Sequence, residues 1–155
     1  MRRRRPEKRM ILPDTKYNDL SVAKFINYIM ESGKKGVAEK IFYGAMELVR
    51  KKTKSDGIKI FKKSIENTSP SVEVKSRRIG GATYQVPIEV PKKRAFYLAS
   101  LWIINASKNS SGRPLSEKLA SELIAAANGD GNAIKKKEDT HRMAEANRAF
   151  SHFRF

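Results

Sequence analysis

The sequence predicts a mainly α protein, a single domain of about six helices with a protruding two-stranded β-hairpin arm. Apolar residues recur at helical spacing in six segments, and turn-forming residues separate those segments. Residues 72–90 instead form two β-rich runs around Gly80-Gly81, which is typical of a hairpin. A chain of 155 residues buries roughly 70% of its unfolded surface, so one domain with a real core is expected.

The predicted helices follow one another along the chain, with local start and stop signals. Asp19 is a candidate N-cap of the first helix, Ser32-Gly33 ends it, Pro70 ends the third, and Gly129 ends the fifth. The fourth has apolar residues on more than one face, which predicts a central position in the bundle. The approximate ranges are 20–31, 36–52, 58–69, 95–108, 115–128 and 132–151.

The register of the hairpin is predicted from burial, because a one-residue slip exchanges the two faces of a strand. A three-residue loop, Gly80-Gly81-Ala82, would place Ile79 opposite Thr83, whereas a two-residue loop would mix apolar and charged faces. The longer loop with a bulge is therefore preferred, with Arg78 and Tyr84 meeting near the tip. The packed face would then comprise Val72, Val74, Ser76, Val86, Ile88 and Val90.

The net charge of +17 indicates a polyanionic partner, and nucleic acid is the commonest one. No cysteine and only two histidines are present, so we expect no metal site and no cofactor. Phosphate-binding loops, dinucleotide fingerprints and nucleophile elbows are absent from the sequence, so we predict that the protein is not an enzyme.

Two features of the sequence bear on localisation. The basic start is not followed by an export segment, and no stretch approaches about 18 apolar residues. We therefore expect a cytoplasmic protein with no membrane partner.

Residues 1–17 form a basic arm, and residues 18–155 form the predicted helical domain with its hairpin arm at 72–90 and an aromatic, basic tail at 150–155. The arm carries several arginines and two prolines, so we expect it to be disordered alone and to order on nucleic acid. A simple solubility tail is the alternative.

Another basic stretch, Lys135, Lys136 and Lys137, lies near the predicted start of the last helix. Cations in a first helical turn oppose the helix dipole, which argues for an anionic ligand there.

The charged residues of the predicted hairpin have an alternative interpretation. They can be ordinary surface charges that contact only solvent.

Two runs carry a resemblance to a known family: VEVKSRRIGGATYQVPIEV at residues 72–90 and AIKKKEDTHRMAEANRAFSHFRF at residues 133–155. They closely resemble small-subunit ribosomal protein seven of bacteria and organelles. KFINYIM at 24–30 and KIFYGAMELV at 40–49 are similar to the same family in the same order. Leu101 stands where the family commonly has arginine, and Phe155 stands where it usually has tryptophan.

The resemblance implies a structural constituent of the small ribosomal subunit. Such a protein binds the 3′ major domain of small-subunit (16S) rRNA, nucleates assembly of the head, and lies near the exit-site tRNA and the mRNA path. Neighbouring head and platform proteins are implied partners. The tip residues near the exit site would be Gly80, Gly81 and Tyr84. The implied RNA-binding residues are Arg2, Arg3, Arg4, Arg5, Lys34, Lys35, Lys75, Arg77, Arg78, Lys135, Lys136, Lys137, Arg142 and Arg148. The sequence also predicts RNA contacts from Lys92, Lys93 and Arg94, which form a basic junction before the fourth helix.

The charge alone leaves another class of protein open. A non-specific DNA-binding or nucleoid-type basic protein has the same composition, and equal affinity for duplex DNA and ribosomal RNA would favour it. An RNA-modifying enzyme would need a cofactor pocket or an acid/base pair, and the sequence offers neither.

Overall fold

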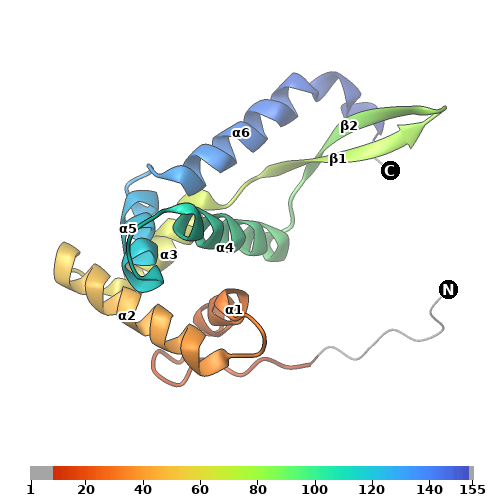
Figure 1. Ribbon diagram of the computed structural model, residues 1–155. Coiled ribbons are helices and arrows are strands. Elements are labelled where there is room, and N and C mark those ends of the chain that lie inside the picture. Colours follow the sequence, from red (N-terminus) through yellow and green to blue (C-terminus); the bar gives the residue numbers. More distant parts are fainter. Residues whose placement is uncertain (1–8, 154–155) are drawn as a thin grey trace. The chain divides into compact units, whose positions relative to one another are not determined.

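The computed structural model describes residues 9–153 of the chain, which divides into two compact units, Met1–Lys40 and Ile41–Phe155. Within the described residues the chain forms helices and one two-stranded antiparallel sheet, which confirms a mainly α fold with a β-hairpin (Figure 1). The elements are α1 (Leu20–Ile29), α2 (Lys35–Thr53), α3 (Gly57–Thr68), β1 (Val72–Ile79), β2 (Ala82–Glu89), α4 (Lys92–Asn109), α5 (Leu115–Ala127), α6 (Asn132–Ala146) and the 3-10 helix η1 (Arg148–Phe153).

Helix α1 lies in the first unit and starts where the sequence predicts. The Asp19 carboxylate accepts a hydrogen bond from the Ser21 backbone N–H at 2.7 Å, which confirms the N-cap. The helix ends at Ile29, because Met30 already has an extended backbone and Ser32 and Gly33 follow with positive φ. Val22, Phe25 and Ile26 are buried, as their helical spacing predicts.

The second unit contains most of α2 and all later elements. Phe42 of α2 meets Phe61 of α3 edge to face, with ring centroids 5.5 Å apart. Helix α4 packs against α3, α5 and α6, which confirms its predicted central position. It begins at Lys92, so the basic residues 92–94 form its first turn rather than a junction before it.

The hairpin register predicted from the sequence is wrong by one residue. Ile79 pairs with Ala82 rather than Thr83, so the loop has two residues, and Ser76 pairs with Gln85. The Ser76 hydroxyl lies 3.1 Å from the Gln85 side-chain oxygen. Both loop glycines have positive φ, as a two-residue type I′ turn requires. Such turns match the right-handed twist of the strands, which favours the short loop.

Burial of both faces explains why the hairpin tolerates this register. Val86 and Pro87 are adjacent and point to opposite faces, yet both are buried. The base of the hairpin is therefore covered on each side, and it needs no single apolar face.

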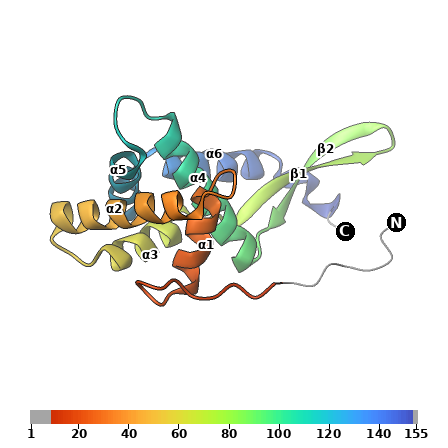
Figure 2. The same ribbon diagram turned by 60° about the horizontal axis from the view of Figure 1, so that its bottom comes forward.

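Helix α6 runs beside the hairpin, and η1 lies against β2. Figures 1 and 2 both show the hairpin projecting beyond α3–α6, with α6 and η1 alongside. The last predicted helix, residues 132–151, is interrupted at Asn147, whose side-chain amide donates to the Met143 carbonyl at 2.7 Å. Among residues 9–153, no helix has the length and apolar character that spanning a membrane demands.

Candidate nucleic-acid interface

Strand β1 of the hairpin carries three of the predicted RNA-binding residues. Lys75 and Arg78 are exposed, and Arg77 is half-buried. Because the register differs from the predicted one, Tyr84 lies opposite Arg77 rather than beside Arg78. The tip glycines Gly80 and Gly81 are exposed, with nothing near the position of an added Cβ atom.

Tyr84 anchors the hairpin to the C-terminal segment. Its ring centroid lies 5.3 Å from that of Phe150 and 5.2 Å from that of Phe153, and the two phenylalanine rings stack on each other at 6.4 Å. We call Tyr84, Phe150 and Phe153 the aromatic cluster. Two phenylalanines of the aromatic tail therefore contact the chain's own hairpin.

Glu73 is a structural residue that the sequence analysis missed. It is 9% exposed, and one of its carboxylate oxygens accepts from the Arg94 guanidinium at 3.2 and 3.3 Å. The other oxygen lies 3.7 Å from the Lys75 ammonium. Arg94 also lies over the Tyr97 ring, with 5.5 Å to its centroid. Arg94, a predicted RNA-binding residue, thus joins β1 to α4. The sequence signal for the ion pair between Glu73 and Arg94 was the presence of an acidic residue within a basic hairpin.

Replacing Arg94 with alanine is expected to destabilise the protein by about 1 to 2 kcal/mol, between the values for exposed and buried ion pairs. The cause is the nearly buried Glu73 carboxylate, which would lose its closest partner. Lys93→Ala is the matched control, because Lys93 is exposed and the charge change is the same. Urea denaturation of both variants measures the difference, and equal stabilities would refute the structural role of Arg94.

A carboxylate of the chain itself lies at the start of α6. The helix begins at Asn132, as predicted, and Lys135 is its fourth residue, so Lys136 and Lys137 lie beyond its first turn. The Glu122 carboxylate of α5 accepts from the Ala133 backbone N–H at 2.8 Å, and therefore supplies the negative charge that the dipole favours. This internal carboxylate satisfies the start of the helix, so the dipole argument does not require an external anion there, and RNA contact by these lysines stays a prediction.

The three lysines of α6 differ in their surroundings. The Lys137 ammonium donates to the Asn67 carbonyl at 2.6 Å, near the C-terminal end of α3, where a cation is favourable. Lys135 and Lys136 are exposed. Of the three, these two are the better candidates for contacts with a partner.

The cations in the second half of α6 and in η1 form weak surface pairs. Arg142 lies 3.8 Å from Asp139, and Arg148 lies 3.4 Å from Glu145. All four side chains are more than half exposed, and such pairs contribute little stability. Their guanidinium groups can therefore exchange a carboxylate for a phosphate at small cost.

The remaining predicted residues fall into three groups. Lys92 and Lys93 are exposed in the first turn of α4. Lys34 and Lys35 belong to the first unit and are exposed, with Lys35 3.9 Å from Glu39. Arg2, Arg3, Arg4 and Arg5 lie outside the described residues, as does Phe155.

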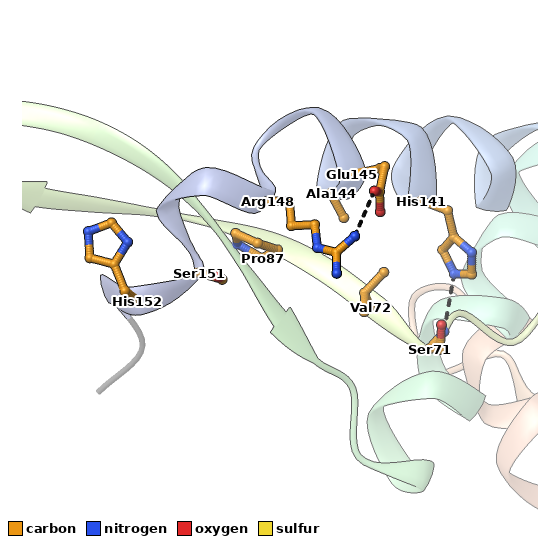
Figure 3. Close-up of a pocket in the computed structure, with 9 residues that line it drawn as sticks. All are labelled: Ser71, Val72, Pro87, His141, Ala144, Glu145, Arg148, Ser151 and His152. Carbon is orange, nitrogen blue, oxygen red and sulfur yellow. Dashed lines mark hydrogen bonds and ion pairs between the residues drawn. The ribbon is translucent and has the colours of Figure 1, made fainter.

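A hollow of about 600 Å³ lies between the base of the hairpin and α6–η1 (Figure 3). We call it the α6 hollow. Side chains from β1 and β2 line one side of it, and side chains from α6 and η1 line the other. Its lining residues are Ser71, Val72, Pro87, His141, Ala144, Glu145, Arg148, Ser151 and His152.

His141 fastens the hairpin base to α6 at one end of this hollow. Its Nε2 accepts a hydrogen bond from the Ser71 backbone N–H at 3.2 Å, which requires that nitrogen to be unprotonated. Burial, together with the nearby Lys137 charge, lowers the pKa of His141 below its ordinary value of 6.5. Both effects favour the neutral ring that this hydrogen bond needs.

Acidification is expected to loosen this connection. Because the pKa of His141 is lowered by folding, the unfolded chain binds more protons below pH 6.5, and the stability from the neutral ring is lost as pH falls through the folded-state pKa. His141→Gln removes the titration and should flatten this part of the stability–pH profile. Hydrogen exchange at the Ser71 amide, measured across this pH range, checks the prediction. Identical pH profiles for the unaltered protein and His141→Gln would contradict the role of His141.

The exposed cations of the hairpin and α6 define a protein with a surface for an anionic partner. A family model described as Ribosomal protein S7p/S5e matches residues 1–148. The chain is 58% identical to the small ribosomal subunit protein uS7 of Thermotoga maritima over 155 residues, which cover all of both chains. It is 57% and 54% identical to the proteins of the same name from Anaeromyxobacter sp. and Novosphingobium aromaticivorans, over 99% of each chain.

The chain therefore belongs to the ribosomal protein S7p/S5e family. This confirms the resemblance noted in the sequence and identifies a structural component of the small ribosomal subunit. It also confirms the prediction that the protein is not an enzyme.

Proposed function

We propose that this protein binds the 3′ major domain of small-subunit (16S) rRNA directly and nucleates assembly of the head of the subunit. The observation that carries the proposal is the gathering of exposed cations on the hairpin and α6. The hairpin carries Lys75 and Arg78, and α6 carries Lys135, Lys136 and Arg142. Both elements belong to one compact unit.

Binding of this kind needs no catalysis. Folded RNA brings phosphates close together, and a hairpin and a helix side by side can neutralise phosphates on neighbouring strands and release their counterions. Recognition would rest mainly on RNA shape and backbone, with base contacts limited to unpaired nucleotides. The cations of the basic arm, residues 1–17, would add further phosphate contacts.

We further propose that the tip around Gly80 and Gly81 lies near the exit-site tRNA and the mRNA path of the cytoplasmic ribosome. The projection of the hairpin tip beyond α3, α4 and α5 supports this (Figure 2). Neighbouring head and platform proteins would contact other faces of the chain.

Competition binding tests the proposal. Labelled 3′ major-domain RNA is titrated with protein at several salt concentrations, against equal-length unrelated structured RNA and duplex DNA. A preference of about a thousandfold that persists at moderate salt is expected for site-specific recognition. Equal binding to all three, collapsing together as salt rises, would refute the proposal and favour a non-specific DNA-binding protein.

A further inference from the structure

We propose that the α6 hollow holds one unpaired base of the bound ribosomal RNA. This inference rests on the proposed function and adds a specific nucleotide site to it. The basic residues of the hairpin and α6 attract the backbone, whereas the hollow would receive a base turned out of its strand.

The shape and lining of the hollow suit a base. Val72 and Pro87 of the strands and Ala144 of α6 supply apolar surface on opposite sides, and about 600 Å³ lies between them and the polar rim. Unpaired RNA bases insert into such sites and stack on flat side chains, including the guanidinium plane of arginine. Arg148 extends over this space in Figure 3 and is 80% exposed, so its guanidinium is accessible for stacking.

The charges around the hollow favour a base over a phosphate. Glu145 lies on the rim and pairs with Arg148 at 3.4 Å, so a phosphate entering here would meet a carboxylate. A carboxylate instead accepts hydrogen bonds from the amino and imino groups of a base edge. The site is therefore suited to a base with donors on its Watson–Crick edge, such as guanine or cytosine.

Other polar groups on the rim can complete the recognition. The Nε2 atom of His141 is occupied by the Ser71 amide, so the neutral ring carries its proton on Nδ1 as a donor. The Ser151 hydroxyl is a further donor or acceptor on the rim. Arg142, exposed on the next position of α6, can hold the adjoining phosphate.

Chemical probing with two matched variants tests the site. Ala144→Leu fills the hollow, and Ser121→Leu adds the same side chain at an exposed position of α5, outside the hairpin and α6. Hydroxyl radicals report backbone contacts along the 3′ major-domain RNA, and base-modifying reagents report Watson–Crick edges. Wild-type protein and Ser121→Leu are expected to protect one unpaired base. Ala144→Leu should expose that base and bind the RNA about tenfold more weakly, because one base contact is lost.

Glu145→Gln provides a second variant that does not alter packing, because the Glu145 side chain is 74% exposed. Loss of a negative charge should tighten purely electrostatic binding, whereas a base site predicts weaker protection of that base. Two outcomes would overturn the inference. In the first, the protein leaves backbone footprints but protects no unpaired base. In the second, base protection is unchanged in both Ala144→Leu and Glu145→Gln. Absence of every footprint on this RNA would instead overturn the proposed function, so the two failures are distinguishable.

Discussion

Replacing Arg77 and Arg78 together with alanine is expected to weaken binding to the 3′ major-domain RNA by roughly thirtyfold near 0.1 M salt, if each arginine contacts one phosphate. The estimate follows from the salt slope, which should fall by about 1.4 to 1.8 for two lost contacts. Folding should remain intact, because both side chains lie on the projecting half of the hairpin. Salt-dependent binding and circular dichroism measure the two effects.

Lys51→Ala with Lys52→Ala is the matched control for that variant. These exposed lysines lie in the last turn of α2, outside the hairpin–α6 surface, and their removal changes the net charge equally. Equal weakening by both double variants would mean that net charge alone drives binding. Loss of the helical signal in the arginine variant would mean that those arginines are structural.

Tyr84→Ala is expected to detach η1 from the hairpin at a cost of about 1 to 3 kcal/mol for two lost ring contacts. Tyr84 joins Phe150 and Phe153, so its removal leaves the C-terminal segment held by fewer contacts. Chymotrypsin cleavage after Phe150 should accelerate about tenfold or more, because cleavage follows the population of the open segment. RNA affinity should also fall, since Arg148 and the α6 hollow depend on the position of η1.

Tyr84→Phe serves as the control for the aromatic contact, because it keeps the ring and removes only the hydroxyl group. Its cleavage rate should match that of the unaltered protein. Unchanged cleavage in Tyr84→Ala would contradict the anchoring role of the aromatic cluster, whereas faster cleavage in both variants would assign that role to the hydroxyl group.

Features set by neighbouring residues were predictable from the sequence. The apolar spacing of α1 and the Asp19 cap depend on contacts within a few residues, and both are confirmed. The central position of α4 followed from apolar residues on more than one face and is also confirmed.

Features set by distant residues were not predictable from local pattern. The hairpin is joined to distant elements by the burial of Val86 and Pro87 and by the ion pair between Glu73 and Arg94, 21 positions apart. The N-terminus of α6 receives its anion from Glu122, 11 positions earlier, and His141 meets Ser71 across 70 positions. Composition indicated a nucleic-acid partner, but it could not separate cations that hold the fold from cations that face outward.

The most direct test of the hairpin–α6 interface uses the absence of cysteine from the chain. Single cysteines at Ala82 on the hairpin, Ala146 on α6 and Ser55 between α2 and α3 are all at exposed positions. Each would carry an iron chelate that generates hydroxyl radicals and cuts nearby RNA. We predict strong, neighbouring cuts in the 3′ major-domain RNA from positions 82 and 146, and weaker cutting from position 55. Strong cutting from position 55 with none from the other two would contradict the interface.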